Sequence, residues 1–253
     1  MKTMIKKGLL NKNKPVIGSW ITLAHPAIAE IMANAGFDWL AIDLEHSVIT
    51  IREAEELIRV IDLSGVIPLV RLTSNNPDLI KRVMDAGANG IIVPMVNSAI
   101  EAEIAVKSIK YPPKGTRGVG LARAQKYGAG FDAYKKWESD GSIVIVQIEH
   151  IDAVKNLREI LSVSDIDGFI VGPYDLSGSM GIPGEFSNPQ YIEAMNKIRE
   201  VAREMNVSAG LHIIEPDKDQ LMKSIDEGYK LIGYSLDIRM LDHSCQSALK
   251  SIK

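Results

Sequence analysis

The sequence lacks several features that mark specialised classes of protein. It contains one cysteine, Cys245, which excludes an internal disulfide and a thiolate metal cage. Nothing beside Cys245 suggests a catalytic nucleophile, so we expect this side chain to be packed. The formal net charge is −3, and the lysines are scattered along the chain. Without a basic excess to neutralise phosphates, nucleic acid is not expected as a partner.

Long apolar runs are also absent. No stretch approaches the roughly 18 consecutive apolar residues that a membrane-spanning helix needs. The first fourteen residues carry five lysines and lack the apolar run of a signal peptide. We therefore expect a cytoplasmic protein with no membrane segment.

The sequence contains instead a regular alternation of short apolar, β-branched runs with segments of helical periodicity. Continuously apolar runs are typical of parallel strands that are buried on both faces. Eight such pairs without a linker predict a single domain over residues 1–253, a (β/α)8 TIM barrel of the α/β class. The predicted strands are Val16–Ile21, Trp39–Asp43, Ile67–Arg71, Gly90–Pro94, Ile143–Glu149, Gly168–Gly172, Ser208–His212 and Leu231–Ser235. The predicted helices are Ala27–Ala35, Ile51–Ser64, Pro77–Ala86, Ala99–Ile109, Asp152–Leu161, Pro189–Met205, Asp217–Glu227 and Asp237–Ile252.

The connections carry two further signals. Gly36, Gly87 and Gly228 each stand at the end of a predicted helix, where a left-handed residue is favoured, and this predicts a recurring helix-to-strand turn. The connection Tyr111–Ser142 is far longer than the others, and loops of that length are usually functional or disordered. We interpret it as a loop that covers the active site, with a solvated surface excursion as the alternative.

Enzymes with this fold place their chemistry at the carboxyl ends of the strands. Charged side chains are rarely buried at such positions without a partner. The candidate residues at these ends are Asp43, Glu45, His46, Arg71, Gln147, Glu149, Tyr174, Asp175 and His212.

Glu149 and Asp175 follow neighbouring strands and offer two hard oxygen donors. Such donors, completed by water and substrate, suit Mg2+ or Mn2+ better than a metal that prefers nitrogen or sulfur. The alternative is that both acids pair with Arg71 or with helix N-termini, and position alone does not decide between these interpretations. Gln147 lies on the same face of its strand as Glu149, because side chains alternate.

Arg71 and His46 are the remaining candidates for chemistry. The guanidinium of Arg71 can grip a substrate carboxylate with two parallel hydrogen bonds. A structural ion pair with Asp43 or Glu45 is the alternative for Arg71. His46 lies beside these same two acids, and a carboxylate-oriented histidine is suited to proton transfer near neutral pH. A packed or exposed histidine without a catalytic role is the alternative for His46.

Three other chemistries lack the residues that they need. No lysine stands at a strand end, which disfavours a Schiff-base aldolase. The loops at 213–217 and 236–239 are acidic and contain no glycine, which disfavours a phosphosugar substrate at the usual barrel phosphate site. No Gly-x-Gly-x-x-Gly follows the first strand, so a dinucleotide cofactor is not indicated.

Together these residues resemble the HpcH/HpaI aldolase family, the metal-dependent (class II) pyruvate aldolases of the pyruvate/phosphoenolpyruvate-barrel superfamily. The resemblance runs nearly from end to end. The segments that carry it are Ala35–Leu40, Asp43–His46, Val70–Arg71, Ile92–Val96, Tyr111–Gly120, Val146–Glu149 and Asp167–Ser177.

The resemblance implies an enzyme, a carbon–carbon lyase that reversibly cleaves a 4-hydroxy-2-oxo acid to pyruvate and an aldehyde through a pyruvate enolate. It also implies a homohexamer built from dimers that exchange the helix Asp237–Ile252. The implied roles are ligation of a divalent metal by Glu149 and Asp175, proton handling by His46 supported by Asp43, and pyruvyl binding by Arg71 and Gln147.

The sequence departs from better-known members of the family on the aldehyde side. Tyr174 stands where a small residue is expected before the metal aspartate, His212 replaces a smaller apolar residue, and the segment after Gly120 is shorter. We therefore expect Tyr174, Asp175 and His212 to border the substrate, while the acceptor aldehyde stays open. One alternative is a related lyase or synthase that acts on an acyl-CoA or an oxaloacetate-type acid. A catalytically silent oligomeric barrel is the other alternative, and the four polar groups kept at one end argue against it.

Overall fold

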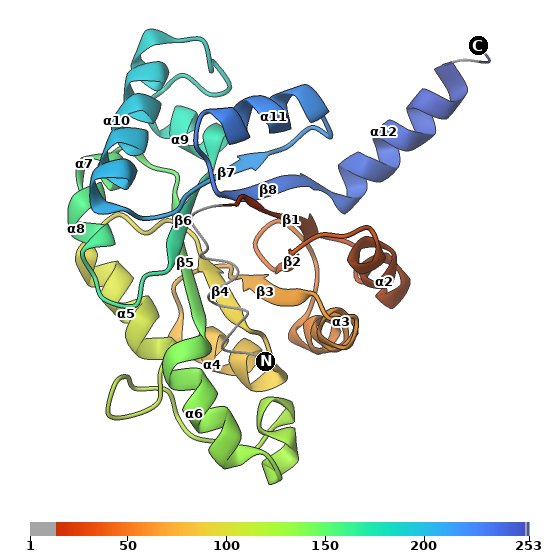
Figure 1. The fold of residues 1–253 in the computed structure, drawn as a ribbon, viewed down its shortest axis with the longest axis vertical. Coiled ribbons are helices and arrows are strands. Elements are labelled where there is room, and N and C mark those ends of the chain that lie inside the picture. The colour runs from red at the N-terminus through yellow and green to blue at the C-terminus, as the bar shows by residue number, and fades with distance from the viewer. Residues whose placement is uncertain (1–13, 251, 253) are drawn as a thin grey trace.

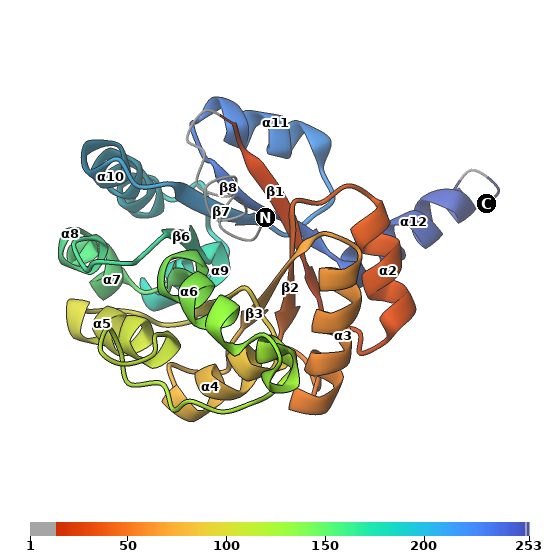
Figure 2. The ribbon, with the colours of Figure 1, turned by 60° about the horizontal axis from the view of Figure 1, so that its bottom comes forward.

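The computed structural model describes residues 14–250 and 252. Eight parallel strands pair in sequence order and close into a barrel, which confirms the predicted fold. Helices surround the barrel on the outside (Figure 1 and Figure 2). The strands are β1 (Val16–Ile21), β2 (Trp39–Asp43), β3 (Ile67–Arg71), β4 (Gly90–Val93), β5 (Ile143–Ile148), β6 (Gly168–Val171), β7 (Ala209–Ile213) and β8 (Leu231–Leu236).

The predicted helices are present, and most agree with the structure within two residues at each end. Gly36, Gly87 and Gly228 have positive φ angles of 98°, 105° and 96°, as the repeated turn requires. The helices are α2 (Pro26–Asn34), α3 (Ile51–Leu63), α4 (Pro77–Ala86), α5 (Ala99–Ile109), α6 (Phe131–Gly141), α7 (Ile151–Lys155), α8 (Leu157–Leu161), α9 (Pro173–Ser179), α10 (Pro189–Met205), α11 (Lys218–Asp226) and α12 (Asp237–Lys250), with a 3-10 helix η1 (Arg123–Gly128).

One predicted helix is wrong because the structure interrupts it. The segment Asp152–Leu161 forms two short helices, α7 and α8, because the backbone of Asn156 leaves helical geometry at φ −97° and ψ 12°. The side-chain amide of Asn156 donates to the carbonyl of Asn97 at 2.9 Å. The break therefore ties the helix pair to the loop that follows β4.

The barrel interior is filled by large side chains opposite glycines. Trp39 is completely buried inside the barrel. A Cβ on Gly18 would lie 1.9 Å from the ring of Trp39, and one on Gly233 would lie 2.9 Å from Nε1 of Trp20. The two tryptophans pack edge to face with their ring centroids 5.9 Å apart. Trp20 thus forms the floor beneath the carboxyl ends of the strands, which we call the mouth.

The expectation that Tyr111–Ser142 covers the active site is wrong for this chain. The segment forms η1 and α6, and η1 packs against α4. Arg123 pairs with Asp62 at 2.8 Å and donates to the carbonyl of Ala86 at 3.2 Å, at the carboxyl ends of α3 and α4. Helices that run antiparallel to the strands end at the opposite side from the mouth. Any connection from a helix to the next strand starts and finishes on that side. Tyr111–Ser142 connects α5 to β5, so it lies at the end of the barrel opposite the mouth.

The expectation that Cys245 is packed is also wrong, since this residue is exposed on α12. Helix α12 projects away from the barrel, and only its first residue, Asp237, is buried (Figure 1). The carboxylate of Asp237 accepts hydrogen bonds from the backbone of Thr22 and Leu23 at 2.8 Å, which anchors the start of the helix. Exchange of α12 between subunits stays a prediction. None of the helices within residues 14–250 is long and apolar enough to cross a membrane.

We expect Gly18→Ala to destabilise the barrel by about 3 kcal/mol, because the added methyl group overlaps the ring of Trp39 and both positions are enclosed by neighbouring strands. Gly178→Ala is the matched control, since a Cβ there meets nothing within 4 Å. Urea unfolding of both variants measures the difference. A Gly18→Ala protein as stable as the control would contradict the packing described for the barrel interior.

Candidate active site

The polar residues predicted from the strand ends converge at the mouth. Side chains alternate along a strand, so a residue two positions after one that fills the barrel interior also points inward. Asp43, Arg71 and Gln147 follow the interior residues Ala41, Leu69 and Ile145 in this way. On β7, for example, Ala209 and Ile213 pack outward against the helices, and His212 therefore faces the interior. The inward-facing residues of this last layer are Trp20, Asp43, Arg71, Gln147 and His212.

Asp43 and Arg71 form a buried bidentate ion pair. The Nε of Arg71 donates to Oδ1 of Asp43 at 2.9 Å, and Nη2 donates to Oδ2 at 2.5 Å. The third nitrogen, Nη1, faces Oε2 of Glu45 at 3.4 Å. The structural ion pair considered for Arg71 is therefore present. Of the three guanidinium nitrogens, Nη1 has the longest of these contacts, to Glu45.

Trp20 supports this pair from below. The guanidinium carbon of Arg71 lies 4.5 Å from the centroid of the Trp20 ring. The ring of His212 lies against another part of Trp20, at 5.2 Å between centroids. Burial, together with the positive charge of Arg71, lowers the pKa of His212 to about 3. His212 is therefore neutral at physiological pH, and its buried Nε2 has no hydrogen-bond partner among the described residues.

His46 is placed differently from the sequence-based expectation. Asp43 Oδ1 accepts hydrogen bonds from the backbone N–H groups of Glu45 and His46, at 3.0 and 3.2 Å, so it fixes the loop rather than the imidazole. The imidazole Nε2 lies 3.9 Å from Oε2 of Glu45. The His46 side chain is 63% exposed. It is thus available to a substrate at the mouth.

Glu149 is held by two hydrogen bonds. Its Oε1 accepts from the backbone N–H of Met95 at 2.6 Å, and its Oε2 accepts from Nε2 of Gln147 at 3.0 Å. Met95 has a positive φ of 51°, which is uncommon for a residue that is not glycine. Its backbone N–H connects the loop after β4 to Glu149, directly after β5. Gln147 is buried, and its Oε1 has no partner among the described residues.

Glu149 and Asp175 border the same small space. Asp175 lies in the first turn of α9, which Pro173 opens. A Cβ on Gly172 would lie 3.0 Å from Oε2 of Glu149 and 3.6 Å from Oδ2 of Asp175. Glycine at this position therefore leaves open a space that two carboxylate oxygens face. Hard oxygen donors around such a space fit Mg2+ or Mn2+.

The charges at the mouth also fit a dication. Burial, helped by the charges of Glu45 and Asp175, raises the pKa of Glu149 to about 7. Burial, helped by Asp43 and Asp175, raises the pKa of Glu45 to about 7 against the opposing effect of Arg71. A cation would remove this repulsion. Within residues 14–250, no three His, Cys, Asp or Glu side chains form a ready-made metal cage, so two protein carboxylates would leave positions free for substrate and water.

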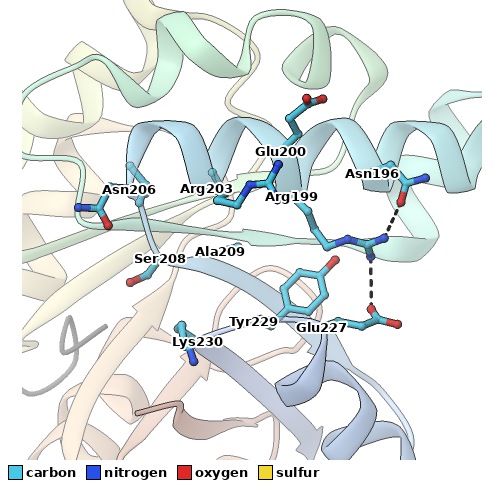
Figure 3. Close-up of a pocket in the computed structure, with 13 residues that line it drawn as sticks. Asn196, Arg199, Glu200, Arg203, Asn206, Ser208, Ala209, Glu227, Tyr229 and Lys230 are labelled. Atoms are coloured by element: carbon cyan, nitrogen blue, oxygen red, sulfur yellow. Dashed lines mark hydrogen bonds and ion pairs between the residues drawn. The ribbon is translucent and has the colours of Figure 1, made fainter. Parts of the chain in front are cut away.

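Two cavities lie outside β7, between α10 and α11. The first, of about 480 Å3, lies at the amino ends of β7 and β8, away from the mouth (Figure 3). The second, of about 500 Å3, extends to residues that follow β6 and β7 beside the mouth, among them Tyr174 and Glu215. Arg199, Glu227 and Tyr229 line both. Figure 3 shows the side chain of Arg199 donating to both Asn196 and Glu227.

Sequence reasoning missed three contributors to this site. The backbone of Met95 carries no sequence signal, because the positive φ of a non-glycine residue depends on the surrounding structure. Trp20 was assigned to a strand without a role, although it lies one residue before the end of β1. Glu45 was considered only as a partner of other residues, and burial of its carboxylate depends on how the loop after β2 folds back.

Comparisons with known proteins match most of the chain. Residues 16–244 match the model of the family described as HpcH/HpaI aldolase/citrate lyase. The chain is 34% identical over 236 residues to a hydroxypyruvate/pyruvate aldolase of Roseobacter denitrificans, which covers 93% of this chain and 91% of the relative. It is 36% identical over 244 residues to a 4-hydroxy-2-oxo-heptane-1,7-dioate aldolase of Klebsiella pneumoniae, with 95% and 91% covered.

A solved structure gives the same result for the fold. An HpcH/HpaI aldolase/citrate lyase family protein from Burkholderia cenocepacia superposes with a TM-score of 0.93. The two sequences are 30% identical, and the match covers 99% of each chain.

We expect the metal-free protein to lose stability as the pH rises. In the folded state the pKa of Glu149 is about 7, whereas an unfolded glutamate titrates near about 4.3. Between these values the folded state binds more protons than the unfolded state, so the free energy of unfolding falls from about pH 4.3 to about pH 7 and stays low above it. Glu149→Gln removes this titration. In chelator, the variant should exceed the parent in stability by on the order of 1–3 kcal/mol at about pH 8 and match it near about pH 4.5.

Urea unfolding at the two pH values tests this expectation, and the difference between variant and parent isolates Glu149 from other titrating groups. If Glu149→Gln is no more stable than the parent at the higher pH, the carboxylate is ionised there without cost. The account of repulsion at the mouth would then be incorrect.

Proposed function

Because the chain belongs to the HpcH/HpaI aldolase/citrate lyase family, we propose that it is a metal-dependent aldolase that reversibly cleaves a 4-hydroxy-2-oxo acid to pyruvate and an aldehyde. One observation carries this proposal. Oxygens of Glu149 and Asp175 border one open space beside Gly172, at the same mouth as the guanidinium of Arg71. Two metal ligands and a carboxylate clamp are what a 2-oxo acid needs for binding.

Glu149 and Asp175 would hold Mg2+ or Mn2+, the ions that prefer carboxylate and water ligands. A dication bound there acts as a Lewis acid on the 2-oxo group and stabilises negative charge on the pyruvate enolate. Met95 and Gln147 keep both oxygens of Glu149 oriented. Preorganisation of this kind maintains ligand geometry in a partly solvated site.

Arg71 would bind the pyruvyl carboxylate through its Nη1 edge. The hydrogen bonds from Nε and Nη2 to Asp43 fix the plane of the guanidinium, and they leave Nη1, whose contact with Glu45 is longer, to meet the substrate. Trp20 supports the same group from below. Asp43 therefore acts as a positioning residue for Arg71 and, through backbone N–H groups, for His46.

His46 would move the proton. Cleavage of the aldol removes the proton of the 4-hydroxyl group and later delivers one to the enolate carbon. An exposed imidazole next to the carboxylate of Glu45 can take a proton from a bound substrate and return it. His212 is a poorer base, since its pKa lies at about 3. We assign it instead to the substrate border, together with Tyr174.

We also propose that the molecules associate through α12 into a hexamer of three dimers. Apolar side chains of this projecting helix are exposed, namely Ile238, Leu241 and Leu249. A second copy of the chain would bury them. Sedimentation equilibrium should therefore give six times the monomer mass, and a monomer at micromolar concentration would contradict this part of the proposal.

The central expectation is that the protein exchanges the methyl protons of pyruvate with deuterated solvent in the presence of Mg2+ or Mn2+. Enolate formation requires no aldehyde, so the reaction reports on the pyruvyl half of the site alone. Chelation should stop it reversibly. Asp175→Asn should lower it by more than about 100-fold because one of two metal ligands is weakened. Proton NMR measures the exchange.

Asp132→Asn on α6 is the matched control, since this exposed aspartate lies at the other end of the barrel. Full exchange in excess chelator, with no metal bound by elemental analysis, would rule out the proposed metal chemistry. Aldol cleavage of a 4-hydroxy-2-oxo acid, followed by pyruvate release, completes the test of the reaction type.

His46→Ala should retain metal and pyruvate binding but slow both methyl exchange and aldol cleavage by on the order of 10²–10⁴-fold, the range for loss of a general acid–base group. Calorimetric titration of Mn2+ and pyruvate establishes that binding persists. Exchange at the parental rate in His46→Ala would show that another base moves the proton.

A further inference from the structure

The cavity that starts beside the mouth is not used by the pyruvyl half of the site. It lies between α10 and α11, outside β7, and has a volume of about 500 Å3. We call it the β7 groove. Residues that follow the carboxyl ends of β6 and β7, among them Tyr174 and Glu215, line its end nearest the mouth, and Tyr174 directly precedes the proposed metal ligand Asp175 in α9. The groove and the proposed metal site therefore share the first turn of α9.

One side of the β7 groove is an aromatic wall. The rings of Tyr174 and Phe186 pack edge to face with centroids 5.0 Å apart, and Phe186 contacts Tyr191 at 5.3 Å. Tyr174 is 53% exposed and Phe186 is 39% exposed, so both rings keep free apolar surface. Met195 and Leu211 continue the lining. Aromatic rings and aliphatic side chains of this kind favour an apolar occupant.

The charged side chains of the β7 groove are already paired. Arg199 contacts Glu227 at 3.3 Å, and Lys223 lies 4.0 Å from the same carboxylate. Glu215 pairs with Arg239 at 2.7 Å. Two positive and two negative residues line the groove, so their charges cancel. A ligand that ends in a carboxylate or sulfonate would have to break one of these pairs to gain a partner.

We propose that the β7 groove holds the tail of the acceptor aldehyde, and that this tail is uncharged and apolar, either a linear chain or an aromatic ring. The inference rests on the proposed aldolase function, because it concerns the far end of the same substrate. Arg71 and Gln147 occupy the pyruvyl side, and the carbon atoms beyond the scissile bond extend past Tyr174 into the groove. Tyr174 and Phe186 are then specificity-determining residues.

A series of unbranched aldehydes tests this inference. Aldol addition of pyruvate to acetaldehyde, propanal, butanal and pentanal should show kcat/KM rising by about fourfold for each methylene, the effect expected from burying one CH2 group. Succinic semialdehyde, which carries a carboxylate at its end, should react at least about tenfold less efficiently than pentanal, since it leaves a charge without a partner. An unchanging series, or a preference for the semialdehyde, would overturn the inference.

Variants connect the preference to the groove. Phe186→Ala should reduce the ratio of kcat/KM for pentanal over acetaldehyde by about tenfold, and Phe186→Leu should give an intermediate ratio. Tyr127→Ala is the matched control, since Tyr127 is an exposed aromatic residue on η1 at the other end of the barrel. The ratio in this control should equal that of the parent. A parental ratio in Phe186→Ala would show that the tail lies elsewhere.

Methyl exchange of pyruvate separates failure of this inference from failure of the proposed function. Exchange requires no aldehyde, so a parent protein that exchanges protons but shows no chain-length preference retains the function and lacks the tail site. A parent that does not exchange fails at the earlier step. Thermal unfolding of Phe186→Ala verifies that the half-exposed ring is dispensable for folding, and Phe186→Leu provides the same comparison with less lost volume.

Discussion

The accumulation of negative charge at one mouth of the barrel is the constraint on which the proposed site depends. Asp43 is neutralised by Arg71, and this pair uses most of the guanidinium's hydrogen-bonding capacity. Glu45, Glu149 and Asp175 remain, with Nη1 of Arg71 as the nearest further positive group. The raised pKa values of Glu45 and Glu149 express the resulting cost of ionisation. A divalent cation between Glu149 and Asp175 would relieve that cost, which is why charge and geometry support the same function.

The site is assembled mainly by backbone geometry. Gly172 leaves space between two carboxylates because it has no Cβ. Met95, which has a positive φ, donates its backbone N–H to Glu149. In the barrel interior, Gly18 and Gly233 make room for the tryptophans that form the floor. Glu149 directly follows a strand and Asp175 lies in the first turn of a helix, so neither is on a long loop. Attachment to regular elements favours a precise arrangement for catalysis.

The order of elements and the mouth residues could be predicted because both follow from short-range patterns. Apolar runs predicted the eight strands, and the positions of Arg71, Gln147 and His212 at strand ends predicted them as residues of the mouth. Other features depend on contacts between distant parts of the chain. Whether Cys245 is buried depends on where α12 packs, and the conformation of Met95 depends on Glu149. The position of the connection Tyr111–Ser142 was predictable from topology alone, although its length suggested a different role.

The most direct test of the account is the position of a bound metal. Crystals of the protein grown with Mn2+ and pyruvate should show an anomalous scattering peak between Oε2 of Glu149 and Oδ2 of Asp175, with the pyruvate carboxylate near Nη1 of Arg71. A peak elsewhere in the barrel, or an ordered water in that space while manganese is bound at another site, would contradict the assignment of the two carboxylates and the function built on them.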